Sequence, residues 1–162
     1  MEQLPQIAPA IRRKFELALF KSLGIDLEPD DPVFCGAREV ILVGGWRAGK
    51  SIRGAARALR AALDPAVSLI WLLGPDYIQA RQEYLYLLDW CYQLDLVLGK
   101  PSMPSEGQCT LKLKTGCVIM TKSAKYPERL GGVAPDLIVL CEPGQMPEDA
   151  YTMTIGRLAK KR

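Results

Sequence analysis

Eight consecutive residues place the tightest constraint on this chain. They read GGWRAGKS, from Gly44 to Ser51, and they fit the pattern G-x-x-x-x-G-K-[ST] at every fixed position. The apolar run Val40–Val43 comes directly before them, and a segment with helical spacing follows. A strand, a glycine-rich turn and a helix in this order are typical of a loop that binds phosphate groups, which we expect here. A glycine-rich turn that carries Lys-Ser by chance is the alternative.

The residue types of this stretch, called the glycine loop below, suit the chemistry of a nucleotide. Gly44 and Gly49 permit positive φ, which lets backbone N–H groups turn toward phosphate oxygens. Lys50 is expected to reach the β- and γ-phosphates, and the Ser51 hydroxyl to bind Mg²⁺. The expected cofactors are therefore ATP and Mg²⁺. The predicted nucleotide-binding residues are Gly44, Gly45, Trp46, Arg47, Ala48, Gly49, Lys50 and Ser51.

Composition narrows the class of protein. The 162 residues are 49% hydrophobic and 24% charged, as in a soluble globular domain, and the net charge of +3 permits contact with nucleic acid without requiring it. The chain has no histidine, and its five cysteines form no C-x-x-C pair, which argues against zinc sites and histidine-dependent catalysis. No signal peptide or membrane span is recognisable, so we expect a cytoplasmic protein with no membrane contact.

The apolar pattern predicts an N-terminal segment and a core. Residues 7–23 have helical spacing, and residues 24–36 form an acidic connector that contains proline. We therefore expect residues 1–36 to be a helix with its connector, and residues 37–162 to be the core.

Within the core, helices and strands are predicted to alternate. Buried strands that alternate with helices are typical of the α/β class, in which helices cover a parallel sheet. Tyrosines and Trp90 on the second core helix are expected to be core, with a base-stacking platform as the alternative. A basic stretch with Lys122, Lys125 and Arg129 could face a nucleotide, DNA or solvent. The predicted elements are a helix over 52–63, a strand over 67–73, a helix over 77–94, a hairpin over 109–120 and a strand over 136–142.

The last strand carries a candidate for the second half of an ATPase site. Leu137–Leu140 are apolar, and Glu142 follows two residues later. ATPases with a phosphate-binding loop place Asp-Glu after such a strand, where the Asp holds Mg²⁺ through water and the Glu orients the attacking water. Cys141 stands in the place of the Asp, and a thiol is a poor ligand for Mg²⁺. An ordinary core strand with a polar end is the alternative.

Four stretches together resemble a known family. They are GGWRAGKS, WLLGPDYIQARQEY, TKSAKYPERLGGVAPD and LCEPGQMPEDAY, and they resemble the ATPase domain of the large terminase subunit of tailed bacteriophages from about Arg38 onward. The resemblance implies a P-loop NTPase of the RecA-like (ASCE) class, with a mostly parallel sheet flanked by helices. It also implies a motor that hydrolyses ATP to drive DNA into a capsid.

The resemblance assigns roles to individual residues. Lys50 and Ser51 match the phosphate and magnesium contacts, with Ser51 as the metal ligand. Arg47 matches a loop arginine at the γ-phosphate, Glu142 matches the catalytic carboxylate, and Gln145 matches the last position of the family's E-A-A-Q pattern. The implied catalytic set is Glu142, Arg47 and Lys50. The implied partners are double-stranded DNA, a portal protein, a small terminase subunit and further copies of the chain in a ring.

Two departures from the family keep other functions open. One is Cys141, and the other is the end of the sequence at GRLAKKR, where the family continues into a coupling motif and a nuclease domain. We therefore expect a core that is truncated before both, and we assign no DNA cleavage to it. The alternatives are another P-loop ATPase that translocates DNA, and a nucleotide-binding fragment without turnover.

Overall fold

The computed structural model describes residues 9–37, 39–45 and 47–159. The chain divides into two compact units, Met1–Leu42 and Val43–Arg162, and each is described by itself. Among the described residues, no helix is long and apolar enough to cross a membrane.

The first unit contains the helix α1 (Pro9–Ser22) and the short 3₁₀ helix η1 (Pro32–Phe34). Its buried contact is between the rings of Phe20 and Phe34, whose centroids lie 5.9 Å apart in an edge-on arrangement. The guanidinium of Arg13 lies over the Phe34 ring. The helix expected over residues 7–23 is therefore confirmed within the described part of the chain.

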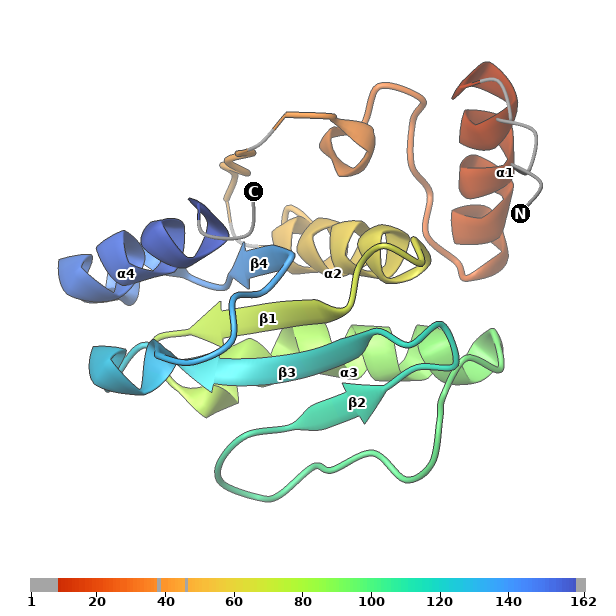
Figure 1. Cartoon of the computed structure of the whole chain (residues 1–162). Coiled ribbons are helices and arrows are strands. Elements are labelled where there is room, and N and C mark those ends of the chain that lie inside the picture. Colours follow the sequence, from red (N-terminus) through yellow and green to blue (C-terminus); the bar gives the residue numbers. More distant parts are fainter. Residues whose placement is uncertain (1–8, 38, 46, 160–162) are drawn as a thin grey trace. The chain divides into compact units, whose positions relative to one another are not determined.

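The second unit is built on a four-stranded sheet in the order β2-β3-β1-β4 (Figure 1). The central strand β1 (Leu69–Gly74) pairs in parallel with β3 (Val118–Ser123) on one side and with β4 (Leu137–Leu140) on the other. The short strand β2 (Thr110–Lys112) pairs antiparallel with β3. These pairings confirm the mostly parallel sheet and the hairpin.

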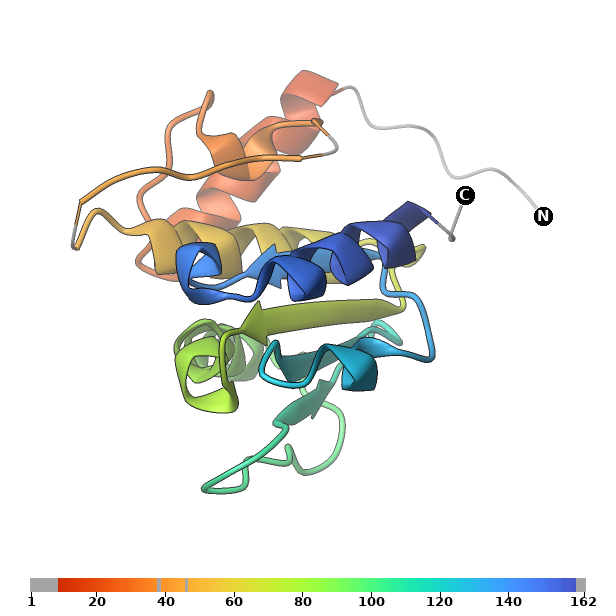
Figure 2. The ribbon, with the colours of Figure 1, turned by 90° about the vertical axis from the view of Figure 1, so that its left-hand side faces the viewer.

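Helices cover both faces of this sheet. The helices α2 (Lys50–Ala62) and α3 (Tyr77–Gln93) pack against each other, and both contact the sheet, α2 through β4 and α3 through β1 and β3. On the other face lie α4 (Glu148–Ala159) and the 3₁₀ helix η2 (Pro127–Leu130). In Figure 2, α3 is seen at the left end of β1, and η2 is seen farther to the right, below β1.

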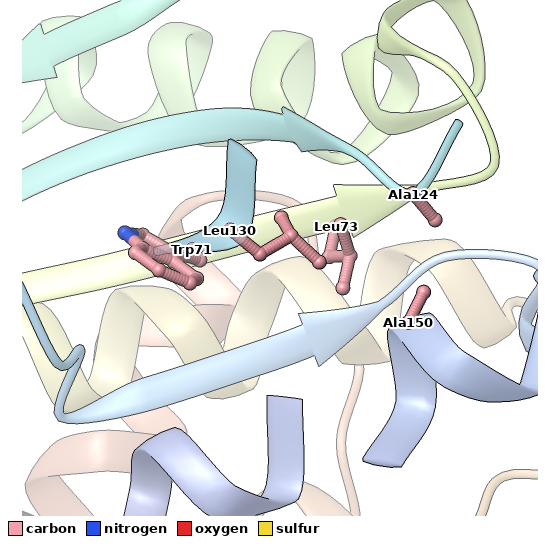
Figure 3. Packing of buried hydrophobic residues seen from close by; sticks show 5 residues of the cluster. All are labelled: Trp71, Leu73, Ala124, Leu130 and Ala150. Atoms are coloured by element: carbon pink, nitrogen blue, oxygen red, sulfur yellow. The ribbon is translucent and has the colours of Figure 1, made fainter. Parts of the chain in front are cut away.

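Successive side chains of β1 point to opposite faces of the sheet, so the strand contributes to the core on both faces. Trp71 and Leu73 point to one face, where Leu130 and Ala150 complete a buried cluster (Figure 3). Ile70, one residue out of phase, is also fully buried and faces the opposite layer. A strand buried on both faces belongs inside an α/β sandwich, as its continuous apolar run predicts.

Two aromatic residues of α3 are part of the core, whereas Tyr92 near its end is exposed. Tyr84 and Trp90 are buried, and the Tyr84 hydroxyl lies within hydrogen-bond distance of the carbonyl oxygens of Ser102 and Thr110. These two side chains therefore do not form an exposed stacking platform for bases.

The helix α4 was not predicted from the sequence. Pro147 comes directly before it, and Glu148 and Asp149 lie in its first turn, where acidic residues favour the positive end of the helix dipole. Ala150 and Thr154, one helical turn apart, are buried positions among its described side chains. Two small buried residues do not produce an apolar stripe that is visible in the sequence.

The prediction of a strand over Val40–Val43 is wrong. Residues 39–45 have no regular secondary structure, and the Ile41 and Val43 side chains are 76% and 91% exposed. A strand of four residues is stable only when a neighbour accepts its backbone hydrogen bonds, and no strand of the described sheet pairs with this segment. The glycine loop is therefore followed by a helix, as expected, but is not preceded by a strand.

We predict that Gly74→Ala destabilises the second unit by about 1–3 kcal/mol. A Cβ atom at Gly74 would lie 2.7 Å from the Asp76 carbonyl oxygen and 2.8 Å from the Ala80 nitrogen, and backbone cannot move aside cheaply. Urea unfolding followed by circular dichroism measures the change. The control is Gly156→Ala on α4, where a Cβ meets nothing within 4 Å. Equal midpoints for the two variants would contradict the prediction.

Candidate nucleotide-binding site

The glycine loop ends directly on α2. Gly49 has φ 75°, and as the N-cap of α2 it makes no side-chain capping hydrogen bond. The first N–H groups of an α-helix have no acceptor within the helix, so this end offers donors and the positive end of the helix dipole. An anion is the natural partner of such an end.

The backbone of the loop differs from the prediction at one glycine. Gly44 does not have positive φ, whereas Arg47, with φ 61°, does. The turn is therefore made by Arg47 and Gly49. Trp46 lies outside the described residues.

The Lys50 side chain folds back over its own loop. Its Nζ atom donates to the carbonyl oxygens of Gly44 and Gly45, at 2.8 and 3.0 Å. Two carbonyl oxygens hold the ammonium without neutralising it, so its positive charge stays within the loop. The Lys50 ammonium is thus placed to bind an anion that enters the glycine loop.

A second positive charge lies beside the loop. Arg53 Nη1 is 3.4 Å from the Ala48 carbonyl oxygen, and a Cβ atom at Gly49 would lie 2.9 Å from the same Nη1. Gly49 therefore has two reasons to be glycine, its left-handed backbone and the closeness of this guanidinium. Gly44, Gly45, Arg47 and Ala48 are exposed.

The carboxyl end of β4 carries a buried thiol and then an exposed carboxylate. Cys141 is 3% exposed, and its backbone nitrogen donates to the Leu73 carbonyl oxygen at 2.8 Å, continuing the pairing with β1. Glu142 is exposed and is the N-cap of the 3₁₀ helix η3 (Pro143–Gln145). The chain therefore turns sharply at Glu142, the residue that the motif predicts to be the catalytic glutamate.

Two of the predicted site residues have unusual backbones. Arg47 and Glu142 lie in the left-handed region, with φ 61° and 53°, which residues with a Cβ seldom adopt. Such conformations cost of order 1 kcal/mol or more and often occur at functional sites. Asp95, after α3, is a third example, so left-handed backbone is not confined to this site.

Gln145 is tied to the helix that follows β1. Its Oε1 accepts a hydrogen bond of 3.2 Å from Nε2 of Gln79 on α3. The carboxyl ends of β1 and β4 are thereby linked through the elements that follow each strand.

A buried acid that sequence reasoning missed lies between the loop and β4. Glu83 on α3 is 5% exposed, and its carboxyl group lies beside the Cys141 thiol and the Ser51 hydroxyl. Burial raises the pKa of Glu83 above its ordinary value, the neighbouring thiol and hydroxyl offset part of this effect, and the nearby Glu142 adds to it. The signal was a charged residue within the apolar stripe of α3, between Ala80 and Leu87.

The thiol of Cys141 stays protonated at neutral pH. Burial raises the pKa of Cys141 well above its usual range, and the neighbouring Glu83 raises it further. A buried neutral thiol offers Mg²⁺ no hard oxygen, in agreement with the sequence-based concern about this position.

The donors near the loop fit Mg²⁺ that is shared with phosphates. Among the described residues, no group of three or more His, Cys, Asp or Glu could hold a metal by itself. Mg²⁺ commonly uses one or two protein oxygens together with phosphates and water, so such a cluster is not needed. Ser51 offers a hydroxyl, and Glu83 Oε2 is buried with no hydrogen-bond partner in the described part of the chain.

The basic stretch that begins at the end of β3 makes contacts within the fold. Lys122 Nζ donates to Gln108 Oε1 at 2.9 Å and lies 5.3 Å from the centre of the Trp71 ring. The Arg129 guanidinium lies 4.5 Å from the centre of the Tyr126 ring. Lys122 is therefore engaged by the sheet and is a poor candidate for a nucleotide contact.

The fold is similar to that of a solved phage protein. The ATPase domain of the Thermus phage P74-26 large terminase matches 88% of this chain, with a TM-score of 0.65 and 16% sequence identity. The chain covers 64% of that domain. No protein-family profile matches the sequence, and no curated protein matches it either. At this identity the likeness shows a shared α/β fold.

We predict that Cys141 resists thiol reagents in the native protein. It is buried and protonated, and Cys91, Cys109 and Cys117 are buried as well, whereas Cys35 is exposed. A short pulse of a maleimide should label about one thiol in the native state, and all five after denaturation. Mass spectrometry counts the labels, with Cys35→Ser as the control that should take none. Rapid labelling of Cys141 would contradict the description of this site.

Proposed function

We propose that this chain is the ATP-hydrolysing part of a terminase-like motor, a RecA-like P-loop NTPase that drives DNA into a capsid. The observation that carries the proposal is the arrangement around Ser51. Glu83 of α3 lies beside Ser51, at the start of α2, and beside Cys141, directly after β4. This closeness supports the assignment of the glycine loop and the end of β4 to one site. The shared fold with a phage terminase ATPase domain supports the same reading.

Binding of ATP would rest on the loop backbone and Lys50. The amides at the start of α2 would donate to the phosphate oxygens, and the Lys50 ammonium would exchange its two carbonyl partners for the β- and γ-phosphates. This exchange replaces neutral acceptors with charged ones, so it strengthens the hydrogen bonds of Lys50.

Hydrolysis would use residues on both sides of the phosphates. Ser51 would hold Mg²⁺, which when bound neutralises charge on the β- and γ-phosphates. Glu142, exposed after β4, would orient the attacking water and accept its proton. Arg47, exposed in the loop, would contact the γ-phosphate.

The larger setting of the motor follows from the family resemblance. It comprises double-stranded DNA as the substrate of translocation, a portal protein and a small terminase subunit as partners, a ring of several copies, and the cytoplasm of the host cell. Another P-loop ATPase that translocates DNA shares these site residues and stays the nearest alternative.

One observation favours a second function, nucleotide binding without turnover. Cys141 replaces the acid that ordinarily follows the strand, and its buried thiol is protonated. A steady-state hydrolysis assay with Mg²⁺ and DNA distinguishes the two functions, because only the motor consumes ATP continuously.

We predict that Lys50→Ala weakens ATP binding by about 10- to 100-fold or more, because it removes the charged donor to the phosphates. Titration of a fluorescent ATP analogue measures the dissociation constant. Lys112→Ala is the matched control, since Lys112 is an exposed lysine of β2, at the opposite edge of the sheet from β4. Unchanged affinity in a folded Lys50→Ala variant would rule out the loop as the phosphate site.

We predict that Glu142→Gln slows hydrolysis by about 10²–10⁴-fold and leaves ATP affinity within a few-fold. The amide keeps the shape of the side chain but cannot accept the proton of the attacking water. Turnover should be measured with and without DNA in the longest gene product that contains this chain. Glu148→Gln, an exposed acid at the start of α4, is the control. Full turnover in Glu142→Gln would mean that Glu142 is only the polar end of a core strand.

A further inference from the structure

We propose that Glu83 supplies the carboxylate that positions Mg²⁺ at this site, in place of the acid that Cys141 replaces. The inference rests on the proposed nucleotide-binding function and adds a residue to it. It concerns a residue of α3, an element outside both the glycine loop and the strand motif.

The position of Glu83 is the first argument. Its carboxyl group contacts Ser51, the residue directly after Lys50, and Cys141, the residue directly before Glu142. An ion held by the Ser51 hydroxyl would therefore lie beside the Glu83 carboxyl group.

The unmet hydrogen bond of Glu83 is the second argument. Oε2 is buried and has no hydrogen-bond partner among the described residues. Leaving a buried acceptor without a donor costs about 1–3 kcal/mol, and more when the group is charged. A cation beside Oε2 would satisfy it. Mg²⁺ prefers carboxylate, hydroxyl and phosphate oxygens, which are the groups that would meet there.

The chemistry of Cys141 is the third argument. Its neutral thiol lies beside the Glu83 carboxyl group and donates to the Val139 carbonyl oxygen at 3.8 Å, so it packs against the carboxyl group and does not compete with it for the ion. In this arrangement the hard oxygen comes from α3, and the residue after β4 holds it in place. Cys141 is then a positioning residue and not simply a lost ligand.

The test measures how strongly Mg²⁺ and nucleotide support each other's binding. Dissociation constants of a fluorescent non-hydrolysable ATP analogue are measured with excess Mg²⁺ and with EDTA, and their ratio is the magnesium effect. Glu83→Gln should reduce this ratio about tenfold or more and should leave binding in EDTA within a few-fold. By linkage, the affinity of Mn²⁺ for the nucleotide complex, followed by electron paramagnetic resonance, should fall by the same factor.

Two further variants sharpen the result. Asp89→Asn removes an exposed carboxylate from the same helix and should leave the ratio unchanged. Glu83→Gln combined with Cys141→Asp places a hard oxygen on the other side of the same contact, and should restore most of the ratio. A role for Glu83 that is only structural predicts no such rescue.

A measurement on the unsubstituted protein does not depend on the folding of any variant. With Mn²⁺ and ADP bound, protein labelled with ¹³C at the glutamate carboxyls should show hyperfine coupling to the metal. Protein labelled with ¹³C at the aspartate carboxyls should show none.

The outcomes distinguish a failure of the role proposed for Glu83 from a failure of the proposed nucleotide-binding function. A parent protein that binds the analogue with a clear magnesium effect, together with a folded Glu83→Gln variant of equal effect, overturns the role of Glu83 and leaves nucleotide binding intact. Absence of glutamate coupling in the labelled protein overturns it as well. A parent protein that does not bind the analogue under any condition overturns the proposed function and this inference with it.

Discussion

Parallel pairing of β1 with β3 and β4 determines where the functional groups of this chain can lie. The registers place Gly74 opposite Ser123, and Leu73 opposite Leu140, so the three strands end at one edge. The chain turns there into α3 after β1, and into Cys141 and Glu142 after β4. The start of α2 comes close to β4, since a Cβ atom at Gly54 would lie 3.2 Å from Val139 Cγ1. This packing brings the glycine loop to the same edge.

The buried pair of Glu83 and Cys141 is costly for the fold in isolation. A buried carboxyl group with one oxygen unsatisfied costs more free energy than an apolar residue of similar volume. A destabilising buried acid of this kind is uncommon in a core unless it has a function. Acids with strongly shifted pKa values occur most often at functional sites. The pair lies beside Ser51, so side chains of α3, of α2 and of the residue after β4 come together where the loop begins its helix.

Much of the fold could be predicted because the signals were local. The apolar runs of β1 and β4, the alternation of the hairpin and the helical spacing of α3 all come from contacts that each segment makes with the core. The Val40–Val43 segment has an equally apolar pattern, but whether it becomes a strand depends on a neighbour elsewhere in the chain. The fully buried side chains among the described residues of α4, Ala150 and Thr154, are small and leave little periodicity to detect.

The candidate site was predictable to the same degree. The motif predicts Gly49, Lys50 and Ser51 as site residues, because spacing alone indicates the chemistry of a phosphate-binding loop. It could not give Glu83, since the meeting of α3 with Ser51 is a product of tertiary packing. It also placed positive φ at Gly44, whereas the turn uses Arg47.

The central claim is that the glycine loop takes the phosphates of a nucleotide, and amide chemical shifts test it most directly. A ¹⁵N-labelled sample is titrated with Mg²⁺·ATP and, separately, with adenosine. The account predicts that the amides of residues 47–51 shift strongly and saturably with Mg²⁺·ATP, and stay in place with adenosine, which lacks phosphates. Shifts that spare these amides, or that adenosine reproduces, would contradict it.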